Sequence, residues 1–397
     1  MTLKLVSARI KNFKSLGDVD LNFRDLTILV GANASGKSNS LDALNFLKKI
    51  LNAPSLPPLD YMDSILRTGE KQISYQITIE DDEINQKAEY SISLSLSDKN
   101  TLIEQEYLLI NGIEVINISN GKGIVKDEDG GNSQIYDSEG DGLALTDAGK
   151  YGKKPFTKNL ASYIKDWKFY DVNPDKVRGY PKILKMINTS QSTDDDEIIA
   201  SLDSSASKSQ EILQYWARYD EHLFKQISQE LNDILNIRLD KKEVKDGKPV
   251  ITVIEKDGKK LALFNLSNGT LRLVAYLIML YQSDIPSLIG IEEPEINFHP
   301  GILQDIANLI KRLSNRTQVI FTTHSSQLLD CFSTEEISSD ISIILLNQKG
   351  EAGTKACLLD KLSATRDDLS DWMNDFGIGS AIYHSNLIEE ILTKEYA

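Results

Sequence analysis

Cysteine and long apolar runs are scarce in this sequence. The 397 residues include only two cysteines, Cys331 and Cys357, which are too few for a disulfide framework. No run approaches the roughly 20 apolar residues that a membrane-spanning helix needs. The alternating opening, residues 1–13, does not resemble a secretion signal. These absences predict a cytoplasmic protein with no membrane partner.

Positive charge is also in short supply. Lys and Arg number 44 against 59 Asp and Glu, which gives a net charge of −15. This balance argues against a generally basic surface that coats nucleic acid, although it leaves a local basic groove open. Two acidic stretches, 126–142 and 193–197, are interpreted as solvated loops, because neither has the spacing of a calcium-binding loop. The length predicts two or three structural units.

The periodic segments of the first half predict strands around one helix. Residues 3–10 and 19–30 have the patterns of strands, and a helix is expected from 37 to 51, before a proline-rich break. Short alternating segments between 73 and 116 predict an antiparallel meander. Residues 117–160 are rich in Gly, Asp, Ser and Lys and are interpreted as loop.

The second half alternates helices and strands. A mostly helical stretch from 157 to 236 includes one amphipathic helix, 207–236, with apolar residues at three- and four-residue steps. A hairpin is expected at 250–264. The elements expected after it are helix 269–282, strand 287–292, helix 301–313, strand 317–322, helix 325–332 and strand 341–346. Such alternation is typical of α/β proteins.

One glycine-bearing turn decides the class. Residues Gly31 to Ser38 match G-x-x-x-x-G-K-[ST] between an apolar strand and a helix, which is the context the pattern requires. The glycines let backbone N–H groups surround phosphate oxygens, and the helix N-terminus adds partial positive charge. Lys37 would reach the β- and γ-phosphates, and the Ser38 hydroxyl would hold Mg²⁺. The residues expected at the nucleotide are Asn33, Ala34, Ser35, Gly36, Lys37, Ser38 and Asn39.

Acidic residues follow directly on another apolar strand. Residues 287–291 lead into Glu292-Glu293-Pro294-Glu295. An acid at the end of such a strand holds Mg²⁺ directly or through water, and a second acid beside it can polarise the attacking water. We therefore assign Glu292 to the metal and Glu293 to the general base. A solvated acidic turn is the alternative interpretation.

A histidine follows a third apolar strand. Residues 318–321 lead through two threonines to His324. A histidine at that edge of a sheet with a phosphate loop can contact the γ-phosphate, so we predict a catalytic role for His324; an ordinary packed histidine is the alternative. His299 is interpreted as local structure or as part of a dimer-contact loop, and His222 and His384 as structural.

A serine and a glycine open the helix that leads to the acidic strand. Ser267, in Leu266–Arg272, is a good N-cap, so on its own this motif is only a capped helix with a glycine. In an ATPase with a composite site, Ser267 and the backbone of Gly269 would point at the γ-phosphate of a nucleotide bound to a second subunit. Each active site would then need two chains.

These motifs, in this order, resemble a known class of ATPase. Phosphate loop, Leu-Ser-x-Gly, acidic strand and histidine resemble the ABC-type ATPase heads of the SMC and RecF class. The sequence is more closely similar to bacterial AAA-family predicted ATPases related to the OLD ATPase domain. The details that carry the resemblance are Ile10–Leu16 with Leu26–Asn33, Leu266–Arg272, and Glu292–Glu295 with Phe298–Pro300.

The resemblance implies a fold, a domain plan and cofactors. The fold class is α/β: a P-loop NTPase of the ABC-type head kind, with a mixed sheet, an antiparallel β lobe and a helical insertion. Such a head binds ATP and Mg²⁺, hydrolyses ATP and dimerises around two ATPs. The implied domains are 1–80 with the phosphate loop, 81–260 as meander and insertion, 261–346 with signature, acids and histidine, and 347–397 as a packing or docking segment.

The sequence departs from the class in three places. Only Gln72 is a candidate for the glutamine loop expected after the first helix. No hinge or long heptad run exists, which argues against long chromosome-tethering arms. The tail contains Asp367, Asp368 and Asp371 but lacks the acidic pattern of an OLD-type nuclease. Any nuclease activity would therefore come from another chain.

Several functions remain open at this point. The favoured one is an ATP-dependent switch, a homodimer or a higher assembly of dimers, that serves a separate effector such as a nuclease in bacterial anti-phage or toxin–antitoxin-like systems. The alternative is a RecF-like ATPase that acts directly on DNA in repair, against which the net charge counts. The long insertion disfavours a transporter subunit, and the presence of Glu293 disfavours a non-hydrolysing scaffold.

Overall fold

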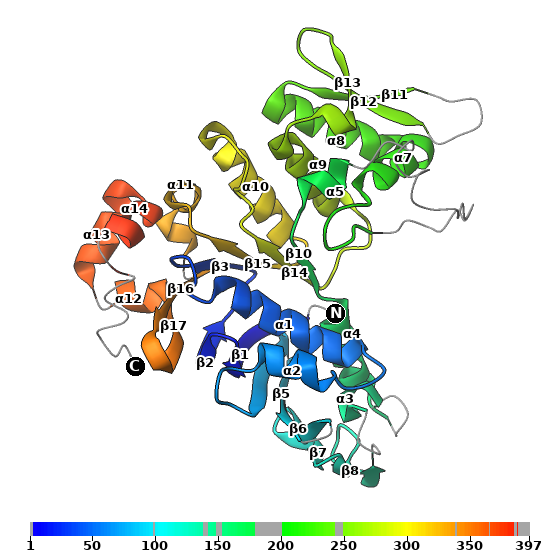
Figure 1. Cartoon of the computed structure of the whole chain (residues 1–397), viewed down its shortest axis with the longest axis vertical. Coiled ribbons are helices and arrows are strands. Elements are labelled where there is room, and N and C mark those ends of the chain that lie inside the picture. The colour runs from blue at the N-terminus through cyan, green and yellow to red at the C-terminus, as the bar shows by residue number, and fades with distance from the viewer. Residues whose placement is uncertain are drawn as a thin grey trace. The chain divides into compact units, whose positions relative to one another are not determined.

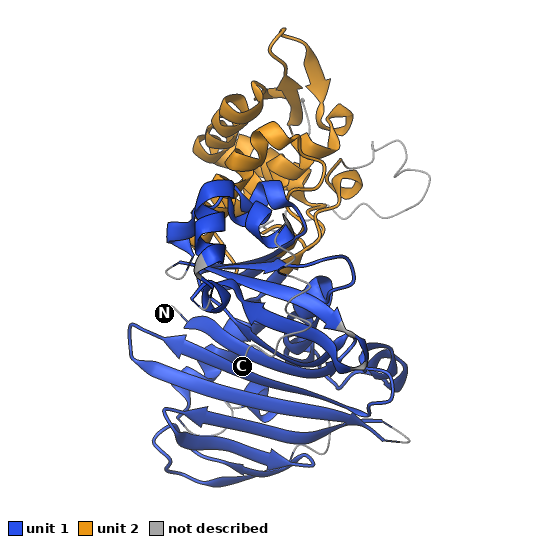
Figure 2. Ribbon diagram, turned by 90° about the vertical axis from the view of Figure 1, so that its left-hand side faces the viewer, with its two compact units in different colours: residues 1–168, 287–290, 318–397 blue, residues 169–286, 291–317 orange. Residues whose placement is uncertain are grey.

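The structure is a computed structural model that divides by its contacts into two compact units (Figure 2). Unit 1 comprises residues 1–168, 287–290 and 318–397, and unit 2 comprises 169–286 and 291–317. The structure describes residues 3–97, 100–137, 142–147, 153–178, 201–242, 249–337, 340–364, 366–384 and 387. The acidic stretch 193–197 lies outside the described residues, and the domain boundaries expected from the sequence stay a prediction.

Unit 1 contains an eight-stranded antiparallel sheet, the broad sheet of Figure 2, with strand order β2-β1-β4-β5-β6-β7-β8-β9. The strands are β1 (Leu3–Phe13), β2 (Leu16–Asn22), β4 (Gln72–Asp81), β5 (Gln86–Leu96), β6 (Thr101–Ile110), β7 (Ile113–Ser119), β8 (Lys122–Val125) and β9 (Gln134–Asp137). On β4, Ile73, Tyr75, Ile77 and Ile79 are all buried, as a strand with one covered face requires. The predicted antiparallel meander is confirmed.

The interpretation of residues 117–160 as loop is wrong. This segment holds β8, β9 and two helices, α3 (Ala144–Asp147) and α4 (Pro155–Asp166). β8 and β9 have only four residues each, which is too short for a visible alternation. Pro155 stands in the first turn of α4, where its missing N–H has no helical partner to lose.

A buried acid fastens α3 to this sheet. Glu106 of β6 is completely buried; its two carboxylate oxygens accept hydrogen bonds from Ala144 N and Leu145 N, each at 2.7 Å, and Tyr90 donates its hydroxyl to one of them at 3.1 Å. Burial raises the pKa of Glu106 to about 7 despite these donors. Glu106 therefore holds a helix end at the cost of a desolvated charge.

A second sheet has the order β10-β14-β15-β3-β16-β17 (Figure 1). Its strands are β10 (Lys168–Tyr170), β14 (Leu288–Glu292), β15 (Gln318–Thr323), β3 (Leu26–Val30), β16 (Ile341–Lys349) and β17 (Gly353–Leu358). β3 pairs in parallel with β15 and β16, whereas β17 is antiparallel to β16. Every residue of β3 and β15 is buried, as parallel strands covered on both faces require. The expected mixed sheet is confirmed.

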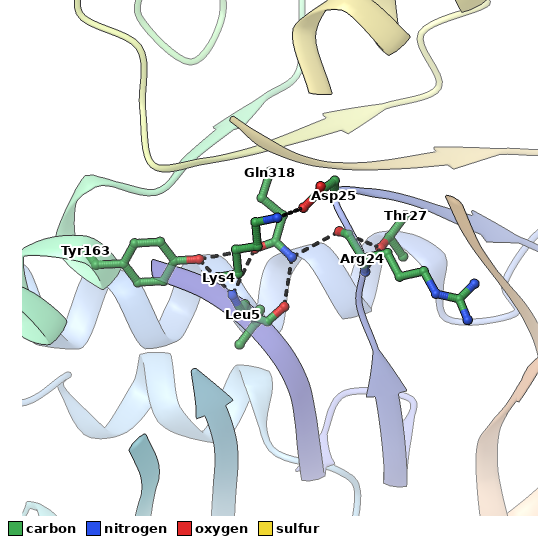
Figure 3. A network of polar contacts seen from close by, with 7 residues as sticks. All are labelled: Lys4, Leu5, Arg24, Asp25, Thr27, Tyr163 and Gln318. Carbon is green, nitrogen blue, oxygen red and sulfur yellow. Dashed lines mark hydrogen bonds and ion pairs between the residues drawn. The ribbon is translucent and has the colours of Figure 1, made fainter. Parts of the chain in front are cut away.

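One glutamine ties β1 to the second sheet (Figure 3). Gln318, the first residue of β15, is 5% exposed. Its Nε2 donates to the carbonyl oxygens of Leu5 at 2.8 Å and Arg24 at 3.0 Å, and its Oε1 accepts from Leu5 N at 2.9 Å and the Tyr163 hydroxyl at 3.1 Å. The amide thus uses all its donors and acceptors, and it holds β1 beside the starts of β3 and β15.

Unit 2 is mainly helical. Its main elements are α5 (Pro174–Arg178), α7 (Ser209–Tyr219), α8 (Glu221–Leu235), β11 (Arg238–Lys242), β12 (Val250–Ile254), β13 (Lys260–Ala262), α9 (Asn268–Tyr281) and α10 (Leu303–Ser314). The prediction of a single helix over 207–236 is wrong. The helix breaks at Asp220, whose carboxylate accepts from Leu223 N at 3.1 Å and caps α8.

The chain after β17 packs on the segment that follows His324. It forms α12 (Leu359–Ser363), α13 (Asp367–Phe376) and α14 (Ile378–His384). Asp330, just beyond α11 (Ser326–Leu329), accepts from Gly379 N at 2.7 Å. A Cβ on Gly379 would lie 2.1 Å from the Ser326 carbonyl oxygen, so glycine permits this close approach. Residues 385, 386 and 388–391 of the predicted tail lie outside the described residues.

Among the residues that the structure describes, no helix is both long and apolar enough to cross a bilayer.

Candidate functional site

The glycine-bearing turn joins β3 to α1 (Lys37–Asn52), and both of its end glycines are required by space. A Cβ on Gly31 would lie 2.2 Å from the Leu346 carbonyl oxygen, and one on Gly36 would lie 2.3 Å from Thr354 Oγ1. Gly36 also has φ 105° and is the N-cap of α1, a conformation that favours glycine. The turn therefore packs closely against β16 and β17.

Lys37 reaches back into the turn that precedes it. Its Nζ donates to the carbonyl oxygens of Gly31 at 2.6 Å and Ala32 at 2.9 Å, and the residue is only 6% exposed. The Ser35 hydroxyl is buried with no partner among the described residues, which costs about 1–3 kcal/mol. An ammonium and an orphan hydroxyl within a ring of backbone groups suit a polyphosphate.

The remaining predicted nucleotide residues of this turn differ in exposure. Asn33, Ala34 and Ser38 are exposed, whereas Gly36 is buried. Ala34 adopts φ 64°, which is uncommon for a residue with a side chain. The exposed members are therefore accessible to a ligand, while the buried members shape the turn.

A polar network behind the turn contains residues that sequence reasoning missed. Asn39, predicted at the nucleotide, donates its amide to Ser15 Oγ at 2.8 Å, and this hydroxyl lies 3.0 Å from Thr354 Oγ1. The Ser15 carbonyl accepts from Arg67 Nη1 and from Thr354 N, both at 2.9 Å. Ser15 and Thr354 are 339 residues apart, so no local pattern signals their contact.

His324 shares an edge of the sheet with the turn. β15 pairs in parallel with β3 so that Thr323 lies opposite Val30, and each strand ends at that point. His324 is exposed, and the next residue, Ser325, caps α11 by accepting from Leu328 N at 3.1 Å. Unit 1 therefore brings the predicted phosphate turn and His324 together.

The predicted metal acid and base lie where the division between the units crosses β14. Residues 288–290 belong by contacts to unit 1, and 291–317 to unit 2. Glu292 ends the strand, and Glu293 follows with φ 41°. A glutamate in this left-handed region carries roughly 1–3 kcal/mol of backbone strain. Both acids are partly exposed, whereas Glu295 is buried.

The signature motif packs within unit 2 against the turn that follows these acids. Ser267 Oγ accepts from Thr270 N at 3.2 Å and caps α9, as predicted. A Cβ on Gly269 would lie 2.5 Å from the Asn297 carbonyl oxygen, and the rings of Tyr276 and Phe298 are 6.2 Å apart. Residues 266–276 and 295–298 therefore form one packed body.

The family of the chain can now be stated. The family described as "AAA domain, putative AbiEii toxin, Type IV TA system" matches residues 26–330, about three quarters of the sequence. The chain belongs to this AAA family. The match spans the phosphate turn, the signature motif, the acids and His324, and it confirms the predicted resemblance.

The solved structures that are similar to this chain include heads of SMC proteins. An SMC head bound to the C-winged helix domain of ScpA is 15% identical, with a TM-score of 0.50, over 89% of this chain and 97% of that one. The SMC head domain from Thermotoga maritima is 13% identical (TM-score 0.43; 90% and 99% covered). A Pyrococcus furiosus SMC head bound to a ScpA domain is also 13% identical (TM-score 0.49; 92% and 99%). No curated protein matches the chain.

The likeness to these solved structures concerns the fold of the chain. Together with the mixed sheet they confirm the predicted α/β ATPase-head class. Nucleotide binding is what the AAA family implies. The roles of individual residues stay predictions.

Among the other candidates, Gln72, His299 and Asp368 have structural partners. Gln72 donates to Glu104 Oε2 at 2.5 Å, so it is engaged within the eight-stranded sheet. His299 Nδ1 accepts from Gly301 N at 3.0 Å, in agreement with the interpretation as local structure. His222 is exposed on α8, the side chain of His384 lies outside the described residues, and Asp368 pairs with Arg366 at 2.6 Å. Within the described residues no group of three or more His, Cys, Asp or Glu could hold a metal.

Proposed function

We propose that this chain is an ATP-hydrolysing head that dimerises around two ATPs and acts as a switch for a separate effector. The observation that carries the proposal is the phosphate turn: Lys37 lies inside it and the Ser35 hydroxyl has no partner among the described residues. On binding, the triphosphate would replace the carbonyl partners of Lys37 with phosphate oxygens. Backbone N–H groups of residues 33–38 would bind the same oxygens.

Ser38 of α1 and the residues at or just beyond the ends of β14 and β15 are proposed to carry the chemistry. Ser38 and Glu292 would be the protein ligands of Mg²⁺; too few acids cluster among the described residues for a metal site built of protein alone. The ion would neutralise developing charge on the phosphates. Glu293 would accept a proton from the attacking water, and His324 would donate a hydrogen bond to the γ-phosphate.

The signature turn is proposed to complete the site of a second copy. Ser267 caps α9 and stands exposed beside the first turn of that helix, where N–H groups and the helix dipole favour an anion. Ser267 and Gly269 of one copy would then contact the γ-phosphate bound by the other. Hydrolysis would remove this contact and release the dimer.

A partner protein is proposed as the receiver of the switch. The family description names a putative toxin of a type IV toxin–antitoxin system, which supports a role in toxin–antitoxin or anti-phage systems. The similar SMC head is described as bound to a domain of ScpA, which supports a head that works with another protein. An effector such as a nuclease is the partner we propose.

The decisive experiment is the oligomeric state of Glu293→Gln with ATP and Mg²⁺. This change keeps the shape of Glu293 and removes the base, so we expect ATP to bind, turnover to fall at least about 100-fold, and a dimer to accumulate in light scattering. Glu335→Gln, an equally conservative change at an exposed position, should behave as the unmodified protein. A Glu293→Gln protein that binds ATP and stays monomeric would contradict the composite site.

The partner is tested by isolating tagged Glu293→Gln protein from its host with ATP present. A stoichiometric second protein supports the effector proposal. DNA bound without a protein partner would contradict it and support action on DNA.

A further inference from the structure

An arginine outside the ATPase motifs donates hydrogen bonds to both sides of the signature turn. Arg178 is the last residue of α5. Its Nη1 donates to the Phe264 carbonyl oxygen at 2.9 Å, and its Nη2 donates to Asn268 Oδ1 at 2.7 Å. Phe264 lies three residues before Ser267 and Asn268 one residue after it. The guanidinium therefore bridges the two ends of the short segment that presents Ser267.

This bridge can fix the position of the serine. A guanidinium is planar, and its donors have a fixed spacing, so two bonds from one group set the distance between their acceptors. Asn268 is the first residue of α9, and Ser267 is the N-cap of that helix. Movement of Arg178 would therefore displace the Ser267 hydroxyl together with the N–H groups of the first turn.

Helix α5, which carries Arg178, is itself held in place. Asn173 Oδ1 accepts from Asp175 N at 3.0 Å at the start of α5, Val177 is buried, and α5 packs against α9. The chain before α5 is bonded to a separate segment, since Asp171 N donates to the Ser204 carbonyl oxygen at 3.0 Å. Arg178 thus extends from a helix that is fixed at its first turn and along its buried face.

We propose that Arg178 is a positioning residue for the composite ATP site: it holds Ser267 and the first turn of α9 where a second copy presents its γ-phosphate. This inference rests on the proposed dimerisation around ATP. Arg178 acts through Asn268 and the Phe264 carbonyl, and it has no part in binding the nucleotide of its own chain.

The test is Arg178→Ala, alone and in the Glu293→Gln background. We expect the ATP affinity of the monomer to be unchanged, and both kcat and the ATP-dependent dimer affinity of the Glu293→Gln protein to fall about tenfold, the loss typical of a hydrogen bond to a charged group. Lys176→Ala is the matched control, because it removes the same charge from an exposed position on the same helix. It should change neither quantity.

Two further variants separate positioning from stability. Arg178→Lys keeps the charge without the fork, so it should fold even if Arg178→Ala does not, and it should retain only part of the dimer affinity. Asn268→Ala combined with Arg178→Ala should cost less than the sum of the single changes, because both remove one bond.

The outcomes are distinct. If Glu293→Gln dimerises with ATP and its Arg178→Ala and Arg178→Lys forms dimerise equally well, the inference is wrong and the proposed function stands. If the variants lose ATP affinity as monomers, Arg178 acts on its own nucleotide or on the fold, and positioning is wrong. If Glu293→Gln itself stays monomeric with ATP, the composite site and this inference both fall.

Discussion

The phosphate turn and the signature turn both need glycine, but they are held in different ways. Gly31 lies beneath the carbonyl of Leu346 and Gly36 against Thr354, so parts of the chain more than 300 residues away confine the first turn. The signature turn has a similar contact, Gly269 against the Asn297 carbonyl oxygen, and it also carries the cap by Ser267 and the hydrogen bonds from Arg178. The first turn packs against two strands of a sheet, whereas the second combines one backbone contact with a side-chain bridge from Arg178.

This difference suggests a division of labour. A turn confined by two strands needs little reordering when it binds phosphate, and such preorganisation favours affinity. A turn held by one fork of hydrogen bonds can be repositioned without unfolding its unit. Changes in the first turn should therefore alter nucleotide binding, and changes in the second should alter dimerisation and turnover after the nucleotide has bound.

The largest effect is expected for Lys37→Ala. It removes the ammonium that lies within the phosphate turn, so ATP affinity should fall about 100-fold or more, as measured by calorimetry. Lys49→Ala, at an exposed position on the same helix, should bind ATP normally. Unchanged ATP binding by Lys37→Ala would contradict the phosphate-turn assignment.

A matched pair of glycine changes tests the division directly. Gly31→Ala and Gly269→Ala each push a methyl against a backbone carbonyl, at a cost of roughly 1–3 kcal/mol in unfolding free energy. We expect Gly31→Ala to lose ATP binding, and Gly269→Ala to bind ATP but not to dimerise. Gly112→Ala, where the new methyl meets nothing within 4 Å but φ is 80°, controls for a loss of stability through backbone strain alone and should bind ATP and dimerise normally. If Gly31→Ala binds ATP without dimerising and Gly269→Ala loses ATP binding, the proposed division between the two turns is wrong.

The smallest effect is expected for Thr354→Val. It removes the hydroxyl that pairs with Ser15 behind the phosphate turn, at a cost of about 1 kcal/mol, so ATP affinity should fall several-fold. Thr252→Val, in β12 of unit 2, should leave ATP affinity unchanged. If both variants bind ATP alike, the network behind the turn has no effect on the nucleotide.

The parts of this site that the sequence could predict are those built by neighbours along the chain. The phosphate turn, the cap at Ser267 and the acids after β14 each depend on fewer than ten consecutive residues. Thr354 and Arg178 could not be predicted, because their partners are 339 and 86–90 residues away. Only the folded chain brings these pairs together.

The errors of fold prediction also have physical causes. Apolar residues recur at helical steps on both sides of Asp220, so the pattern continues across a break that only a capping carboxylate marks. β8 and β9 are short hairpin strands among glycines and acids, and their composition resembles that of a loop. Periodicity identifies long elements, whereas short ones depend on their partners.

Buried Glu106 makes folding a proton-uptake reaction near neutral pH. Its pKa is about 7 in the folded protein and about 4.3 in an unfolded chain, so the folded state binds more protons between these values. Its contribution to stability is complete below the lower value and is lost as pH rises through about 7, in total roughly 4 kcal/mol. A change of pH within this range would therefore alter how firmly α3 stays on its sheet.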